Sequence, residues 1–153
     1  MKRLTIWCVL LTSAGACTSQ TVVRQPEFAV APALTVERFL QAANSRDLDT
    51  MSRLFGDQDG PFGDTRNRVT VELRMDALSA ILRHDGYDIV SERRVAGAEF
   101  PSTRFGVDLL LPGGVTMVRD VGFTVLLESP NRWLVHVIKV DKVTRTGNAG
   151  RRN

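Results

Sequence analysis

The sequence predicts an α+β domain in which three N-terminal helices pack on a curved antiparallel β-sheet. Between residues 34 and 85, apolar residues recur every three or four positions, as on one face of a helix. Between residues 87 and 141 they alternate with other residues, as along a strand, and Pro- and Gly-containing turns separate the segments. When helices precede strands in this way, the helices are expected to cover one face of an antiparallel sheet.

Residues 1–16 have the three parts of an export signal. Lys2 and Arg3 supply the positive start, residues 4–11 an apolar run, and residues 12–16 the small and polar side chains of a cleavage region. The apolar run is too short to span a bilayer, and nothing later in the chain is a transmembrane candidate. The mature protein is therefore expected outside the cytoplasm.

Cysteine usage indicates how the exported chain is held. Cys8 would leave with the signal, so the mature chain would keep only Cys17 and form no internal disulfide. Residues 13–17 resemble the bacterial lipobox, in which signal peptidase II cuts before a cysteine that becomes acylated. Three acyl chains, at about 0.8 kcal/mol per buried CH2, would anchor the protein permanently. The same residues also fit ordinary secretory cleavage, which would leave Cys17 as a free thiol.

The localisation expected for the lipidated form is the periplasmic side of the cell envelope. Thr18 follows the cysteine, and under the enteric sorting pattern this residue directs a lipoprotein to the outer membrane. Residues 17–33 contain polar residues and two prolines without a sustained period, which is typical of a tether. A flexible coil of about 15 residues has a root-mean-square reach of roughly 20 Å. The domain can therefore stand away from the membrane.

The domain is predicted to span residues 34–143, and it begins with two short helices that end at Gly56. Thr35 is a suitable N-cap for the first helix and Asp47 for the second, because both side chains can accept a hydrogen bond from a free backbone N–H. Apolar residues follow each cap at the spacing of one helical face: Val36, Phe39, Leu40 and Ala43 in the first helix, and Leu48, Met51, Leu54 and Phe55 in the second.

A polar segment and a third helix come next. Residues 57–65 are rich in Asp, Gly and Pro and are predicted to form a loop. Residues 69–85 predict a third helix, which Gly86 can end. Its apolar face would consist of Val71, Met75, Leu78 and Leu82, widened by Ala77 and Ile81.

The second half of the domain predicts four strands, at residues 87–95, 105–111, 115–128 and 133–141. Turn signals at residues 112–114 and 129–131 join consecutive strands, so an antiparallel meander is expected. The third strand is expected to be interrupted between Arg119 and Gly122. Residues 144–153 are polar and basic and predict a disordered tail.

Charge and motifs exclude several function classes. The formal charge of +3 falls to +1 without Lys2 and Arg3, and no cluster of basic and aromatic residues suggests a nucleic-acid platform. The Asp57-x-Asp59-Gly60 spacing resembles the start of a calcium loop, but Phe62 and Arg68 stand where that loop needs Gly and Glu. No serine elbow, metal-ligand cluster or Gly-rich phosphate loop is present. We therefore expect no cofactor and no metal.

Three segments carry a resemblance to a known family: residues 36–42 (VERFLQA), 46–49 (RDLD) and 54–56 (LFG). In this order they resemble the start of the NTF2-like superfamily, also called SnoaL-like or cystatin-like, and its small bacterial lipoproteins in particular. The resemblance covers residues 34–143. It implies that the sheet bends round the helices into a cone with a pocket inside, and that enzymatic members place Asp, His, Tyr or Arg side chains in that pocket.

Candidate pocket residues follow from residue type alone: Tyr87, Asp108, Asp120 and His136. His136 alternates with apolar residues on the last strand, so it is either a core histidine with its hydrogen bonds satisfied or an acid-base catalyst. Asp108 and Asp120 flank a hairpin turn and would be either neighbours or both exposed to solvent; paired carboxylates would suit acid-base chemistry. Tyr87, at a helix-to-strand junction, is expected mainly to pack.

Two functions are kept, with a weaker third. The first is a membrane-anchored, non-enzymatic binding or assembly module whose partner is a small apolar ligand or an envelope protein. The second is a small-substrate enzyme of isomerase or dehydratase type that uses the cone pocket. The third is an accessory domain that supports a larger complex. Convergent polar groups in the cone would favour an enzyme, and a filled interior would favour binding. Apolar residues on both faces of the last strands also predict a sheet-to-sheet homodimer.

Overall fold

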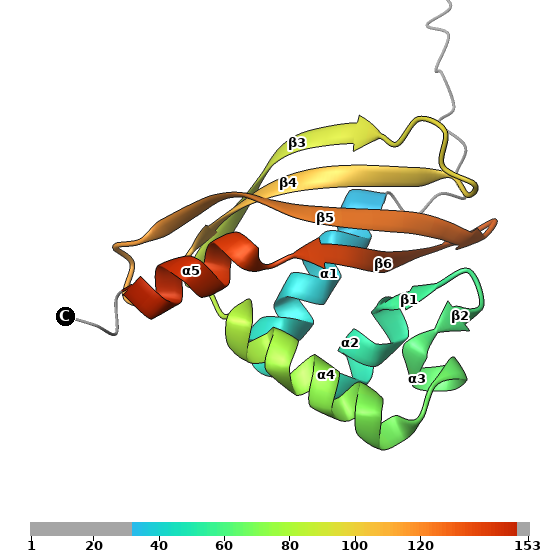
Figure 1. The fold of residues 1–153 in the computed structure, drawn as a ribbon, viewed down its shortest axis with the longest axis horizontal. Coiled ribbons are helices and arrows are strands. Elements are labelled where there is room, and N and C mark those ends of the chain that lie inside the picture. The colour runs from blue at the N-terminus through green and yellow to red at the C-terminus, as the bar shows by residue number, and fades with distance from the viewer. Residues whose placement is uncertain (1–31, 150–153) are drawn as a thin grey trace, which may run out of the picture.

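The computed structural model describes residues 32–149, and Cys17 with the predicted signal and most of the predicted tether lies outside them. Helices come first and a curved antiparallel sheet follows, as expected for an α+β fold (Figure 1). The helices are α1 (Pro32–Ser45), α2 (Leu48–Leu54), α3 (Phe62–Thr65), α4 (Arg68–Ile81) and α5 (Asp141–Ala149). The strands are β1 (Gly56–Asp57), β2 (Gly60–Pro61), β3 (Gly86–Arg94), β4 (Ser102–Leu110), β5 (Met117–Ser129) and β6 (Arg132–Lys139).

Helices α1 and α2 confirm the predicted pair, with differences at their ends. Asp47 caps α2 as predicted, because its carboxylate accepts a hydrogen bond of 3.0 Å from the backbone N–H of Thr50. Thr35 is not an N-cap: α1 begins at Pro32, a residue that suits a first helical turn, and Thr35 is buried. Gly56 lies beyond the end of α2. A side chain there would collide with the backbone of Gly60 and with Leu134.

The predicted loop at residues 57–65 contains regular structure. Strands β1 and β2 form a small antiparallel hairpin, and one turn of helix, α3, follows it. The hairpin is attached to the main sheet, since Phe55 pairs in parallel with Val135 of β6. This pairing joins segments 80 residues apart. The Asp, Gly and Pro content of residues 57–65, from which a loop was predicted, is local and cannot indicate it.

Helix α4 is shorter than the predicted third helix. Asn67 caps it by accepting a hydrogen bond from the backbone N–H of Thr70, and it ends at Ile81 with Leu82 as its C-cap. The chain then leaves the helix before His84, whose backbone N–H donates to the side chain of Asn44 at 3.1 Å. That contact ties the end of α4 to the end of α1.

The predicted meander is confirmed, with strand order β3-β4-β5-β6. Three bulges bend it, and a fourth register shift adjoins the β5–β6 turn, between Leu127 and Ser129. One lies opposite Asp108, where Arg119 and Asp120 occupy the place of one residue and Asp120 has a φ of 53°; this is the interruption expected in the third strand. The others leave Val90 in β3 and His136 in β6 without a paired residue. Extra residues of this kind increase the local twist and so help the sheet to curve.

Helix α5 replaces part of the predicted tail. The expectation of disorder from residue 144 is wrong as far as residue 149, and residues 150–153 lie outside the described part of the chain. Two features hold the helix: Val143 is buried, and the hydroxyl of Thr144 donates to the carbonyl of Asp141 at 3.1 Å. Polar composition alone predicted the tail from residue 144, and the helix that continues into it begins before Val143, at the end of the predicted domain.

The two faces of the sheet have different surroundings. The inner face lies toward α1, α2 and α4, as Figure 1 shows. The outer face, turned away from these helices, bears two glycines paired across β4 and β5, Gly106 and Gly122. The apolar residues expected there do not form an open patch: Leu134 is buried beside Gly56, and the bulge at His136 turns Ile138 to the inner face. This removes the argument from an exposed apolar face, and the homodimer itself stays a prediction.

Candidate functional site

The space between the helices and the inner sheet face is occupied by apolar side chains. Four phenylalanines from both layers, Phe39, Phe55, Phe105 and Phe123, have at most 2% of their surface exposed. Phe39 and Phe55 lie with ring centroids 6.0 Å apart, within the range of favourable aromatic contacts. Large aliphatic side chains complete the packing: Val36, Leu40, Met51, Met75, Leu82, Val107 and Leu109. The place where a cone pocket was expected is thus a core.

Tyr87 belongs to the rim of this core. It pairs with Leu109 across β3 and β4, and its ring meets the ring of His84 edge to face at 5.4 Å. Burial and the negative charge of Glu37 raise the pKa of the Tyr87 hydroxyl, although a hydrogen bond with Gln41 partly opposes them. A hydroxyl held protonated between α1 and β3 is suited to packing, the role expected for it.

Asp108 and Asp120 are close to each other, but their carboxylates have separate partners. Asp108 is buried on the outer face, where one carboxylate oxygen accepts the backbone N–H of Asp120 at 2.8 Å. Its other oxygen accepts Nη1 of Arg119 at 3.0 Å. The Asp120 carboxylate instead faces Nζ of Lys142 at 3.2 Å. Each carboxylate therefore has its own cation, and the pair stabilises the bulge.

His136 lies in a recess of about 510 Å³, hereafter the His136 recess. Its Nδ1 is 3.0 Å from the carbonyl oxygen of Gly56. A carbonyl only accepts, so Nδ1 carries the hydrogen, and Nε2 of the neutral ring remains as the basic nitrogen. The walls come from three segments: Asp57, Gln58 and Asp59 of the β1–β2 turn; Val95, Ala98, Glu99, Phe100 and Ser102 before and at the start of β4; and Thr124 and Leu126 of β5.

The acidic side of this recess is organised by Arg66. Its Nη2 lies 2.7 Å from Asp57 and 3.7 Å from Asp59. Burial alone would raise the pKa of the Asp57 carboxyl. Hydrogen bonds from Arg66 and from the backbone of Asp59, together with the positive charge of Arg66, hold this pKa below its usual value. Asp57 is therefore an anion at neutral pH.

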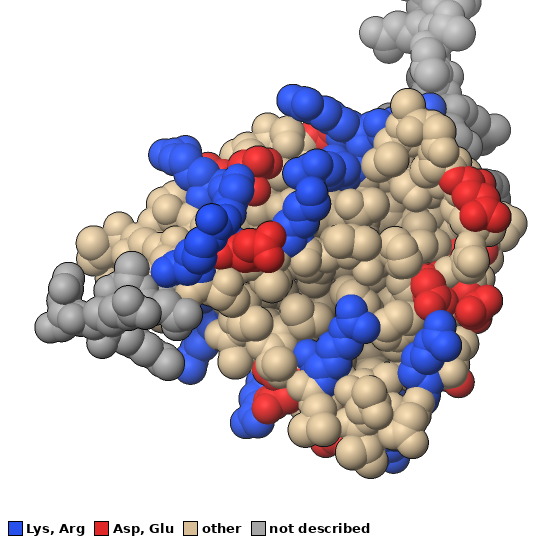
Figure 2. Space-filling model, viewed as in Figure 1, with Lys and Arg blue, Asp and Glu red and all other residues tan. Residues whose placement is uncertain are grey.

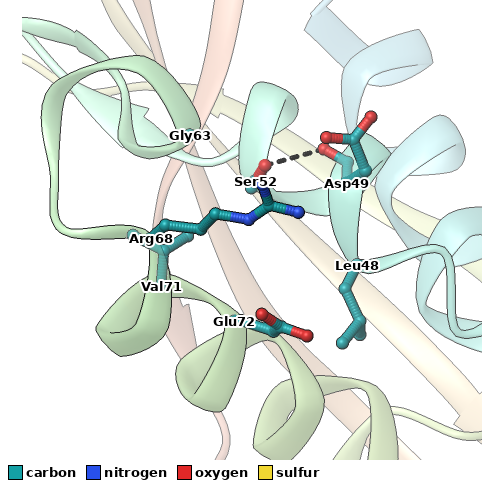
Figure 3. Close-up of a pocket in the computed structure, with 7 residues that line it drawn as sticks. All are labelled: Leu48, Asp49, Ser52, Gly63, Arg68, Val71 and Glu72. Atoms are coloured by element: carbon teal, nitrogen blue, oxygen red, sulfur yellow. Dashed lines mark hydrogen bonds between the residues drawn. The ribbon is translucent and has the colours of Figure 1, made fainter.

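A second pocket, of about 290 Å³, lies between α2, α3 and α4 (Figure 3). Arg68 extends from the start of α4 across it toward Ser52, and Glu72, one turn later, points to the same opening beside Leu48 (Figure 3). The Ser52 hydroxyl is used within the chain, since it donates to the carbonyl of Asp49 at 2.7 Å. Gly63 is required by the approach of α3, because a side chain there would come within 2.6 Å of that hydroxyl.

The predicted site residues are thus dispersed. Tyr87 lies at the core rim, Asp108 on the outer sheet face and His136 in its recess, and no pocket brings the three together within residues 32–149. Asp57 and Arg66 were missed as site residues. The sequence does contain a signal for Asp57, since the turn at residues 57–60 is acidic although its spacing does not fit a calcium loop.

Comparison with known proteins adds no identity: no protein-family model matches the chain, and no curated protein matches it either. Within residues 32–149, no three His, Cys, Asp or Glu side chains gather as metal ligands would. None of the described helices has the length and apolar character that crossing a membrane requires. Function must therefore be inferred from the recesses and surfaces themselves.

Proposed function

We propose that this protein is a lipid-anchored component of the bacterial cell envelope whose domain, of NTF2-like type, acts as a non-enzymatic binding or assembly module. In this proposal Cys17 carries the lipid on the periplasmic side, residues 17–33 give the domain reach, and the His136 recess receives a small ligand with an apolar body or an apolar side chain of an envelope protein. The anchor rests on the lipobox-like residues 13–17.

The observation that carries the binding role is the packed interior. Apolar side chains, not convergent polar ones, fill the space between the helices and the sheet. Enclosed chemistry needs a cavity from which water can be excluded, and a filled core offers none. The His136 recess is different: Val95, Phe100 and Leu126 give it apolar walls, and its volume falls in the range of small-molecule sites.

The anchor is tested by intact mass spectrometry of the untagged protein from its native membrane fraction. The expected mass begins at Cys17 and includes a diacylglycerol and an N-linked acyl chain. A chain that begins at Cys17 without acyl groups would contradict the anchor, and the protein would then be a free periplasmic one with the same recess. A Cys17→Ser variant, expected in the soluble fraction, serves as the control.

The binding role is tested with a neutral apolar dye, N-phenyl-1-naphthylamine, whose fluorescence rises in apolar surroundings. We expect saturable binding by the wild-type protein and a loss of about tenfold in affinity in Phe100→Ala, because that change removes one wall of the recess. Val115→Ala is the matched control, since Val115 is 90% exposed and lies outside the recess. Equal binding by all three proteins would contradict a site in the recess.

One observation favours an enzyme as the second candidate. Because Nδ1 of His136 donates to Gly56, its Nε2 is a base in a recess that also contains Asp57 and Asp59. An isomerase or dehydratase using this base would turn over a small β-hydroxy or α,β-unsaturated carbonyl compound. It would lose that turnover in His136→Gln while still binding the dye. Absence of turnover across such a compound set would leave the binding module as the better account.

A further inference from the structure

Among residues 32–149, the outer face of the sheet carries more positive charge than the acidic side chains on it, Asp88, Asp108 and Asp120, can neutralise. Five cations lie on it or at its edge: Arg93, Arg104, Arg119, Lys139 and Lys142. Arg119 is paired with Asp108 and Lys142 with Asp120. Arg93, Arg104 and Lys139 have no ion-pair partner among residues 32–149 and are exposed. Figure 2 shows the result, with basic side chains gathered over the sheet and acidic ones among them.

The three unpaired cations are neighbours. Arg93 lies directly opposite Arg104 in the pairing of β3 with β4. The Arg104 side chain leans over Gly122 of β5, where a Cβ atom would be 3.3 Å from its Nη2. Lys139 pairs with Gly122 from β6, and its Cδ would be 3.5 Å from the same Cβ. Glycine at this position thus allows cations from β4 and β6 to approach over one strand.

Nothing within the described chain compensates for this arrangement. Like charges placed directly opposite on neighbouring strands destabilise a sheet. Arg93 and Arg104 form such a pair, whereas Arg119, Lys142 and Arg66 elsewhere in the structure each face a carboxylate. A group of cations kept against this cost is best explained by an anionic partner outside the chain.

We propose that the outer face docks on a bilayer surface rich in anionic phospholipid. The unpaired cations extend from β3 to β6, across three interstrand spacings or roughly 14 Å. A spread of this size matches a plane of phosphate groups better than a single small anion. This docking rests on the proposed anchor, since a tether of roughly 20 Å keeps the domain within reach of the membrane and raises its effective concentration there.

The test uses the chain of residues 17–153 carrying Cys17→Ser, so that any membrane binding comes from the protein surface alone. The probe is a sedimentable vesicle of equal parts phosphatidylglycerol and phosphatidylcholine, with pure phosphatidylcholine for comparison. We expect binding to the anionic vesicles in about 50 mM salt and its loss in about 500 mM salt, because the Debye length falls from more than 10 Å to less than 5 Å.

The deciding variant is R93Q/R104Q. Each basic residue at a membrane surface contributes about fivefold to partitioning, so the double variant is expected to bind roughly thirtyfold more weakly. The matched control is R38Q/R83Q, which removes the same charge from exposed positions on the helical side of the domain. We expect it to change binding less than threefold. Circular dichroism and the urea midpoint verify that both variants are folded.

Two outcomes would overturn the proposal. If the two double variants weaken binding equally, net charge and not the outer face attracts the membrane. If the Cys17→Ser chain with its cations intact does not bind anionic vesicles at low salt, the cations serve another partner, such as an acidic protein. Both results are independent of the mass measurement, because the protein tested carries no lipid. Failure of the docking and failure of the anchor can therefore be told apart.

Discussion

The two faces of the four-stranded sheet are built on opposite principles. The inner face is closed: Phe105, Val107, Val121 and Phe123 are fully buried against the helices. The outer face is open, with glycines at paired positions and cations that lack partners in the described chain. The inner face therefore accounts for stability, and the outer face, together with the recess at its end, is where we propose that recognition takes place. A curved sheet over helices can thus enclose a packed core instead of a cavity.

The largest effect is expected from the inner face. Phe123→Ala should lower the free energy of unfolding by about 3–5 kcal/mol, because it removes a fully buried aromatic ring and leaves a cavity. Urea denaturation followed by circular dichroism measures this change. Thr124→Ala, the neighbouring residue on the outer face, is the control and should cost less than 1 kcal/mol, within the ordinary range for partly exposed positions. Equal costs would mean that the interior is not packed.

The bulge at His136 allows the inner and outer faces to be compared with two valines of the same strand. Val135 and Val137 would share a face in a regular strand, but Val135 is fully buried and Val137 is 42% exposed. Val135→Ala is expected to cost about 2–3 kcal/mol, the transfer of two methyl groups plus a cavity. Val137→Ala should cost about 0.5 kcal/mol or less. Similar costs for the two valines would show that the bulge is misplaced.

The charged bulge on the outer face should have an intermediate effect. Asp108→Ala is expected to lower the free energy of unfolding by about 1–3 kcal/mol, because the backbone N–H of Asp120 loses its acceptor. Asp108→Asn keeps one oxygen acceptor and should recover about half of that loss. Urea denaturation of both variants measures the difference. If Asn were as damaging as Ala, the charge of Asp108 and not its hydrogen bond to Asp120 would hold the bulge.

A smaller effect of opposite sign is expected where the cations crowd together. Arg93→Gln should raise the free energy of unfolding by about 0.2–1 kcal/mol, because it removes a like charge directly opposite Arg104. The gain should shrink at high salt, since the repulsion is screened. Arg38→Gln, on α1, is expected to give no gain. A loss of stability in Arg93→Gln would indicate a compensating contact and weaken the case for an external partner.

The smallest effect concerns pH and the His136 recess. The pKa of Asp57 is lower in the folded chain than in the unfolded one, so its ionised form stabilises the fold above about pH 4. That contribution is lost as the pH falls through the lowered pKa. Asp57→Asn should therefore flatten the decline in stability below about pH 4, as urea midpoints at several pH values can measure. If the slope of stability against pH is unchanged, the ion pair between Asp57 and Arg66 does not contribute to the loss of stability in acid.

Periodic segments were predictable because each encodes its own geometry. The apolar stripe beginning at Val36 predicted α1, and the turn at residues 112–114 joined β4 to β5. Helix α5 was not predictable from its polar composition, since its position depends on burying Val143. The β1–β2 hairpin likewise depends on a distant pairing, that of Phe55 with Val135. Local sequence therefore predicts periodic helices and turns, but not elements whose position depends on contacts with distant residues.

The candidate site was less predictable than the fold. Residue type suggested His136 for the cone pocket, whereas the structure places it in a recess outside the packed core, and strict alternation fails beyond it because a bulge has no fixed sequence signal. Asp108 was selected for acid-base chemistry and instead accepts hydrogen bonds from Arg119 and Asp120. Pairing of Gly106 with Gly122 was invisible until the register of β4 and β5 was known. The chemistry of a side chain follows from the sequence, but which side chains lie next to one another across the strands does not.

The unpaired residue in β6 also bears on how this strand can change length. In a regular strand, loss of one residue exchanges the two faces for everything beyond it. Deletion of His136 would leave Val137 opposite Thr124, Ile138 opposite Phe123 and Lys139 opposite Gly122, all in their present register. The strand thus contains one residue that the pairing with β5 does not need, and this residue lines the recess. Deletion of His136 is therefore expected to remove the imidazole from the recess while the rest of β6 keeps its pairing.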